Sequence, residues 1–178
     1  TYLHGNYRQK YQELLEDFQP EVIGISALTA ESECLHWLAD AAKDICPSSL
    51  VIAGGPHPTA YPDDTLKNPN INLAVINEGE ITFREIAARL DRQIGWKDVP
   101  GIAYRGGNGE IIFTAQQAFI TDLDTIPYPA FDLVDFRAYA KLHAFTPVRR
   151  RPYMNMMTSR GCPYRCTYCH SIQGKKFR

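Results

Sequence analysis

Three of the five cysteines of this chain stand within eight positions near its C-terminal end. They are Cys162, Cys166 and Cys169, in the spacing C-x3-C-x2-C. Cysteine thiolates on one short loop are standard ligands of an iron–sulfur cluster. In a four-iron cluster, three protein ligands leave one iron open to another molecule. Residues 149–178 hold eight basic residues and no acidic one, and nearby positive charge stabilises thiolates.

Zinc binding, a redox pair and nucleic-acid binding are alternative functions for this loop. A structural zinc site needs a fourth ligand, and His170 directly follows Cys169. Neighbouring side chains rarely face one ion, which disfavours zinc. A redox pair of Cys166 and Cys169 would need a βαβ pattern that does not follow it. The basic end also admits a nucleic-acid surface, although nucleic acid is not the expected partner.

The elements that must position these residues begin with an alternation of helices and strands. Apolar runs predict strands covered on both faces, and residues at helical spacing predict helices. The predicted strands are 22–28, 50–55 and 71–77, and the first predicted helix is 6–18. A second helix is expected to begin at the cap Thr29 and to bury a stripe of Leu35, Leu38, Ala39, Ala42 and Ile45. A third is expected to bury Phe83, Ile86, Ala87 and Leu90. Such alternation indicates an α/β fold with a parallel sheet and helices on both faces.

The predicted organisation has three parts. Residues 1–100 form the α/β domain, which with only three visible strands is expected to be incomplete at its N-terminus. Residues 101–152 hold a β-hairpin at 101–114 and a linker containing prolines. Residues 153–178 begin a second domain, with a strand at 153–159 leading into the cysteine loop. The chain is therefore expected to be a fragment, truncated at both ends.

The cysteine loop resembles the signature of the radical S-adenosylmethionine superfamily, including the aromatic Tyr168 before the last cysteine. This resemblance implies that the three cysteines ligate a [4Fe–4S] cluster and that Tyr168 lies beside the adenine of S-adenosylmethionine. The strand and loop would then be the first elements of a truncated radical S-adenosylmethionine β/α barrel. The reduced cluster would cleave S-adenosylmethionine to methionine and a 5′-deoxyadenosyl radical.

The first half resembles flavodoxin-like cobalamin-binding domains. Ser26-Ala27-Leu28 and Gly54-Gly55 stand 28 positions apart like the S-x-L and G-G elements of those domains, and "GGPHPTAYPDD" and "NEGEITF" resemble N-terminal stretches of cobalamin-dependent radical enzymes. The resemblance implies cobalamin contacts from a set of eight residues: Ser26, Leu28, Gly54, Gly55, His57, Glu78, Gly79 and Glu80. The D-x-H-x-x-G motif is missing from the chain, so the lower cobalt ligand is left open. His57, expected in a surface loop, is read as a packing or tail-contact residue rather than that ligand.

Together the two resemblances imply a cobalamin-dependent radical S-adenosylmethionine enzyme. Its expected reaction is methyl transfer or cyclisation on an unactivated carbon of a small-molecule substrate, with an external electron donor such as flavodoxin or ferredoxin. The fragment alone is expected to be inactive. Two alternatives are a non-catalytic cobalamin-binding or sensory module with a structural metal site, and a radical enzyme that modifies RNA. No apolar run is long enough to span a bilayer, and Cys34 and Cys46 are expected to be reduced thiols, so the sequence predicts a cytoplasmic protein.

Overall fold

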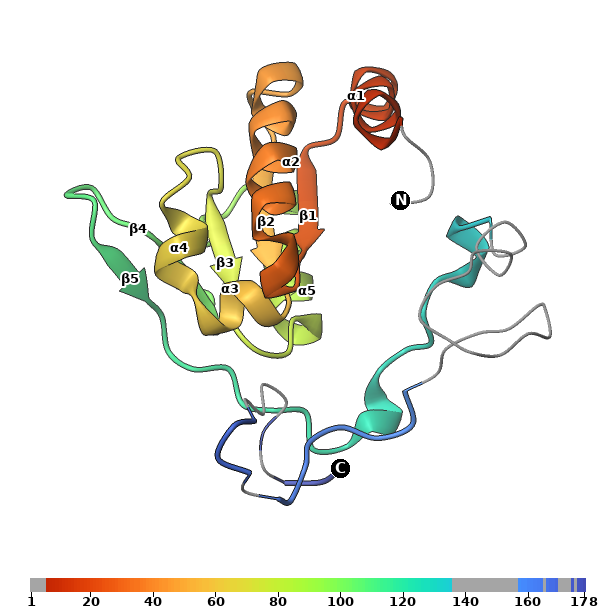
Figure 1. Ribbon diagram of the computed structural model, residues 1–178, viewed down its shortest axis with the longest axis vertical. Helices are drawn as coiled ribbons and strands as arrows, with labels where there is room; N and C mark the ends of the chain where they lie inside the picture. The colour runs from red at the N-terminus through yellow and green to blue at the C-terminus, as the bar shows by residue number, and fades with distance from the viewer. Residues whose placement is uncertain (1–5, 136–156, 165, 170–173, 175) are drawn as a thin grey trace. The chain divides into compact units, whose positions relative to one another are not determined.

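The computed structural model describes residues 6–135, 157–164, 166–169, 174 and 176–178. The chain divides into two compact units, Thr1–Phe119 and Ile120–Arg178. The first unit contains the sheet and the helices labelled in Figure 1. The second unit is described separately below.

The first unit is built on one five-stranded sheet in the order β1-β2-β3-β4-β5. Its strands are β1 Val22–Ser26, β2 Leu50–Gly54, β3 Leu73–Val75, β4 Ile102–Arg105 and β5 Ile111–Phe113. Strands β1, β2 and β3 are parallel, whereas β4 and β5 are the predicted hairpin and run antiparallel to their neighbours. The predicted α/β fold with a parallel sheet is thus confirmed. The hairpin continues that sheet across residue 100, and the division at residues 100 and 152 stays a prediction.

Helices precede or connect the strands in the expected order. They are α1 Tyr7–Phe18, α2 Ser32–Ile45, α3 Pro56–Ala60, α4 Pro62–Leu66 and α5 Glu80–Asp91. The predicted cap at Thr29 is wrong, because Thr29–Glu31 forms a 3₁₀ turn before α2. There the backbone N–H of Leu28 donates to Glu31 Oε2 at 2.9 Å, so a glutamate side chain satisfies the backbone donor that precedes the turn.

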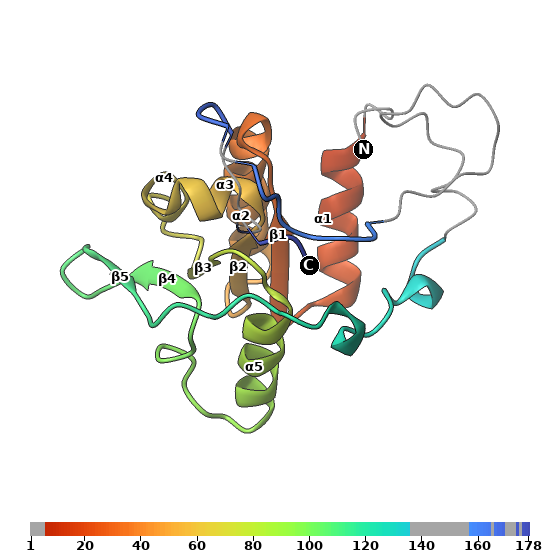
Figure 2. The same ribbon diagram turned by 90° about the horizontal axis from the view of Figure 1, so that it is seen from below.

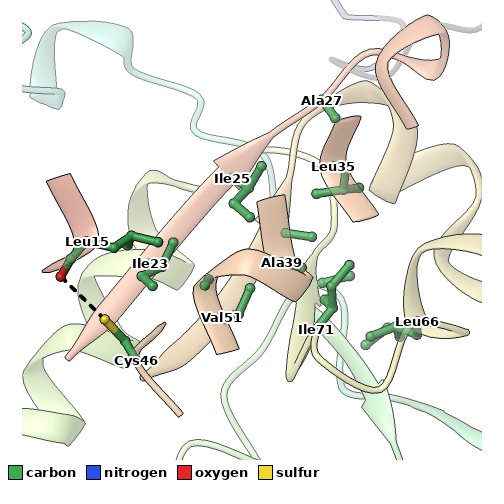
Figure 3. Packing of buried hydrophobic residues seen from close by; sticks show 14 residues of the cluster. Leu15, Ile23, Ile25, Ala27, Leu35, Ala39, Cys46, Val51, Leu66 and Ile71 are labelled. Atoms are coloured by element: carbon green, nitrogen blue, oxygen red, sulfur yellow. Dashed lines mark hydrogen bonds between the residues drawn. The ribbon is translucent and has the colours of Figure 1, made fainter. Parts of the chain in front are cut away.

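Two apolar clusters cover the two faces of the sheet, and Figure 2 shows α2 and α5 on opposite sides of it. On one face, Leu35 and Ala39 of α2 pack against β1 and β2, as the helical stripe predicts (Figure 3). Ala42 belongs to the same buried cluster. The buried Cys46 donates its thiol to the carbonyl of Leu15 at 3.6 Å, which ties α1 to the end of α2. On the other face, Ile86 of α5 is fully buried against β2, β3 and β4.

Strand β1 is covered on one face only, which corrects the expectation of two covered faces. Ile23 and Ile25 are buried towards α2, whereas Gly24 and Ser26 on the opposite face are exposed. The reason is the position of α5, whose buried residue Ile86 packs over β2 to β4 and leaves the adjoining part of β1 uncovered. This uncovered part of the sheet becomes one wall of the cavity described below.

The second unit holds 3₁₀ turns at Leu123–Thr125 and Phe131–Leu133. Its last described residues are held together by backbone hydrogen bonds, two between Arg160 and Arg178 and one from Cys162 N–H to the Gly174 carbonyl at 3.2 Å. The predicted strand at 153–159 is not tested over 153–156, which lie outside the described residues; residues 157–159 form no strand. In the described part of the chain, every helix is too short or too polar to cross a membrane.

Candidate ligand-binding site

A cavity of about 390 Å³ opens at the carboxyl ends of β1, β2 and β3, beside the start of α5. This is the edge at which open parallel sheets generally bind ligands, and the volume falls within the range of small-molecule sites. Its lining residues are Gly24, Ile25, Ser26, Ile52, Ala53, Gly54, Gly55, Val75, Asn77, Gly79, Glu80, Phe83 and Arg84. The lining therefore combines apolar strand residues and glycines with a small number of polar side chains.

The parallel register brings the two predicted motifs together. Ser26, the last residue of β1, stands opposite Gly54, the last residue of β2. Beyond the strands, Ala27 N–H donates to the Gly54 carbonyl at 3.1 Å, and His57 N–H donates to the Ala27 carbonyl at 3.0 Å. The two loops that follow β1 and β2 are thus joined by backbone hydrogen bonds, and they form one continuous wall of the cavity.

The two adjacent glycines differ in their surroundings. Gly55 has φ of 91°, and a Cβ there would lie 2.7 Å from Ser26 Oγ and 3.2 Å from the backbone of Ala27. It is a glycine because the neighbouring loop leaves no room. A Cβ on Gly54 would meet no atom within 4 Å, although this residue lines the cavity. Its missing side chain therefore keeps part of the cavity open.

The loop between β3 and α5 forms the third side of the site. Asn77 adopts the left-handed conformation with φ of 67°, and its N–H donates to Thr59 Oγ1 at 3.0 Å. This unusual backbone at the rim of a cavity is typical of ligand sites. Gly79 and Glu80 line the cavity as well, whereas Glu78 is buried and does not. Glu78 and Glu80 each make a hydrogen bond, an ion pair or another electrostatic contact.

Gly24, Phe83 and Arg84 are among the lining residues that the sequence did not assign to the site. Gly24 lies within the β-branched run of β1, where a glycine can mark a close approach by a ligand, and that signal was available. Phe83 was assigned to the buried stripe of its helix, but 41% of its surface is exposed, and a Cβ on Gly24 would lie 3.8 Å from its ring. Arg84 carries no sequence signal of its own. Ala87, predicted with the same stripe, is exposed.

Besides Glu78, two further residues of the predicted set lie outside the cavity lining. Leu28 is 53% exposed beside the 3₁₀ turn. His57 was expected in a surface loop, but it is buried in α3, with only 3% of its surface exposed. The reason is Asp64 of α4, whose Oδ2 accepts a hydrogen bond from His57 Nε2 at 3.1 Å; the Nδ1 of the same ring is buried without a partner among the described residues.

Asp64 is the centre of a small polar cluster behind the cavity wall. Its Oδ1 accepts from Lys67 Nζ at 2.5 Å, and His36 Nε2 lies 3.8 Å from its Oδ2. The hydrogen bond from Lys67 is the main cause that holds the pKa of Asp64 below its usual range, and the charges of Lys67, His57 and His36 act in the same direction against the effect of burial. The hydrogen bond between Asp64 and His57 thus links α4 to α3.

The cysteine loop, in contrast to the cavity, is largely exposed. Cys162 is half-buried, and Cys166 and Cys169 are exposed, joined by a turn in which Cys169 N–H donates to the Cys166 carbonyl at 3.2 Å. Tyr168 is 91% exposed. Over the described ranges, no three His, Cys, Asp or Glu side chains form a group that could hold a metal ion. The three thiols therefore do not form a preorganised site here.

Comparisons with known proteins find similarity over most of the chain. Residues 5–87 match the family model of the B12 binding domain. An uncharacterized methyltransferase, PH0819 of Pyrococcus horikoshii, is 33% identical over 168 residues, which are 93% of this chain and 35% of that protein. The cobalamin-dependent radical SAM methyltransferase TokK of Streptomyces tokunonensis is 29% identical over 156 residues, 85% of this chain and 22% of TokK. The chain thus spans about a third or less of these relatives.

A solved structure shares the fold. The cobalamin-dependent S-adenosylmethionine radical enzyme OxsB, with aqua-cobalamin and S-adenosylmethionine bound, superposes with a TM-score of 0.79 at 24% identity. The match covers 98% of this chain and 23% of OxsB. At this identity the likeness establishes the fold of the chain.

Proposed function

We propose that this chain binds cobalamin in the cavity at the ends of β1, β2 and β3, because residues 5–87 match the family model of the B12 binding domain. The observation that carries the proposal is the open space at Gly54. This glycine lines the cavity, and a Cβ on it would meet nothing within 4 Å. A flat group on the ligand can therefore pass close to the backbone of β2 without a side chain in its way.

The chain's own residues then have distinct roles. Ser26 lies at the same wall and offers a hydroxyl to the tail of the cofactor, while Gly54 keeps the path of the tail open and Gly55 allows the loop after β1 to approach closely. The apolar residues Ile52 and Val75 of β2 and β3 exclude water from that path. Leu28, His57 and Glu78 support the loops around the cavity from outside it.

The whole protein is proposed to be a cobalamin-dependent radical S-adenosylmethionine methyltransferase acting on a small-molecule substrate, with an external electron donor such as flavodoxin or ferredoxin. When bound, cobalamin supplies a transferable methyl group, and a [4Fe–4S] cluster supplies an electron to S-adenosylmethionine. Cys162, Cys166 and Cys169 would hold that cluster, with Tyr168 beside the adenine. This part rests on the donor chemistry and spacing of the thiols and on the similarity to TokK. A mass gain of one methylene in the product would distinguish methyl transfer from the alternative, cyclisation.

Titration of the 178-residue chain with hydroxocobalamin, followed by absorbance, tests the cobalamin proposal. Gly54→Val should weaken binding by about tenfold or more, since its methyl groups would enter the cavity, while thermal unfolding stays close to that of the wild type. The matched control is Gly107→Val in the hairpin turn, where a Cβ also meets nothing within 4 Å but no cavity residue is near in the sequence. Equal affinity of wild type and Gly54→Val would refute this site.

A further inference from the structure

Two neighbouring side chains of α5 face the cavity without a role in the motifs considered above. Phe83 exposes 41% of its surface, and its ring lies beside Gly24. Arg84 follows it and also lines the cavity. A partly exposed aromatic ring and a cation on a mostly apolar cavity are features of binding rather than of packing.

The charge of Arg84 is available to a ligand. In the part of the chain that the structure describes, its guanidinium makes no hydrogen bond or ion pair. The acidic residue that lines the same cavity, Glu80, already takes part in another interaction. Arg89, one turn further along, is in contrast fully engaged with Glu85 and Asp98. Arg84 is therefore the cation of this cavity that a bound anion can use.

The chemistry of this pair defines its ligand. An aromatic ring offers a face for stacking, and arginine pairs bidentately with phosphate oxygens. We propose that Phe83 packs against the aromatic base of the cobalamin tail and that Arg84 binds the phosphodiester that joins this base to the corrin. The inference rests on the proposed function and deepens it, because it assigns the recognition of the tail's base and phosphodiester to two side chains of α5 that line the cavity.

Cobinamide provides the test, since it has the corrin ring but lacks the base, the ribose and the phosphate. The 178-residue chain should bind hydroxocobalamin more tightly than cobinamide. Arg84→Gln should weaken cobalamin binding about tenfold or more and leave cobinamide binding unchanged. Arg84→Lys should recover part of the loss because it restores the charge without the bidentate geometry. The matched control is Arg92→Gln, which removes an exposed charge at the far end of α5, outside the cavity.

The role of Phe83 is tested by removing its aromatic ring. Phe83→Ala should weaken cobalamin binding at least about threefold, whereas cobinamide binding should not change. The isolated tail separates the two contacts: α-ribazole 3′-phosphate, which carries its phosphate on the same ribose oxygen as cobalamin, should lose affinity in Arg84→Gln, and α-ribazole without phosphate should not. Rising salt should reduce the wild type's preference for the phosphorylated form and have little effect on Arg84→Gln.

The outcomes distinguish the two levels of the proposal. A wild-type chain that binds neither cobalamin nor cobinamide refutes the proposed function. A wild-type chain that binds both equally leaves cobalamin binding intact but overturns the recognition of the tail. A wild-type chain that prefers cobalamin, with the full preference kept in Arg84→Gln, overturns only the assignment of the phosphodiester to Arg84. Full preference in Phe83→Ala overturns the assignment of the base.

Discussion

At the scale of single residues, Gly54 and Gly55 show how one short motif meets two physical requirements. Gly54 leaves open space in the cavity, so its replacement is expected to affect the ligand. Gly55 packs against Ser26 and Ala27 and has a positive φ, so its replacement is expected to affect the fold. The motif G-G therefore couples the shape of the site to the contact between the two loops that build it.

Gly55→Ala separates these requirements. The methyl group would lie 2.7 Å from Ser26 Oγ, on a backbone with φ of 91° that side chains rarely adopt. We expect a loss of about 1–3 kcal/mol in the free energy of unfolding, measured by urea denaturation. Gly107→Ala is the control and should stay within about 0.5 kcal/mol of the wild type. A Gly55→Ala variant as stable as the control would contradict the close approach of the two loops.

Asp64 gives a prediction on pH. Its pKa lies below the usual value of 3.8, chiefly because of the hydrogen bond from Lys67. A carboxyl group with a lowered pKa stabilises the fold above its unfolded pKa, and this contribution disappears as the pH falls through the folded pKa. Asp64→Asn should therefore be less stable than the wild type at pH 7, and the difference should shrink below about pH 3.8.

Urea denaturation over a pH series measures this difference. Asp63→Asn is the matched control, because Asp63 is the exposed neighbour in the same helix and makes no ion pair among the described residues. The difference between Asp63→Asn and the wild type should stay nearly constant. A difference for Asp64→Asn that grew as the pH fell would have the wrong sign for a carboxylate stabilised by Lys67.

At the scale of elements, the fold could be predicted from the sequence more completely than the site. The strands and the long helices were predictable because apolar side chains repeat along them at strand and helix periods, as at Leu35, Ala39 and Ala42. The role of Phe83 was not, because the same periodicity describes a ring that faces a core and a ring that faces a cavity. Only the position of α5 relative to β1 distinguishes the two cases.

The prediction that His57 lies in a surface loop was wrong for a different reason. Its burial depends on Asp64, seven residues along the chain and in another short helix, neither of which the apolar pattern predicts. The short helices α3 and α4 each begin with a proline, and prolines on both sides of His57 suggested a loop. Proline at the first position of a helix is equally common, so the same residues fit both readings.

The position of α5 depends on its buried face, which gives a prediction for the element as a whole. Ile86 is fully buried among residues of β2, β3 and β4. Ile86→Ala should cost about 2–5 kcal/mol in the free energy of unfolding, measured by urea denaturation, because it leaves a void beneath the helix. Ile94→Ala is the control, since Ile94 is 51% exposed just beyond α5 and should change stability little. A small effect at Ile86 would contradict the packing that leaves β1 uncovered.

At the scale of the whole molecule, the proposed cofactor sites fall in separate units. The cavity lies within Thr1–Phe119, and the three clustered cysteines lie within Ile120–Arg178. The first site is already formed by the fold of its unit. The second has its donor atoms, but over the described ranges they do not form a metal group. The two sites are therefore expected to respond independently to substitution.

Anaerobic reconstitution of the 178-residue chain with iron and sulfide tests that independence. The wild type should take up iron with the absorption of an iron–sulfur cluster. Replacement of Cys162, Cys166 and Cys169 by Ala should abolish this uptake but leave hydroxocobalamin affinity unchanged, since no cavity residue is altered. Cys34→Ala, in the first unit, is the control for cysteine loss and should keep the iron. Uptake of zinc in place of iron by the wild type would contradict the assignment of the cysteines, because three thiolates that serve a redox cluster do not by themselves form a closed zinc site. A fall in cobalamin affinity in the triple variant would contradict the independence of the two sites, because these cysteines lie outside the unit that holds the cavity.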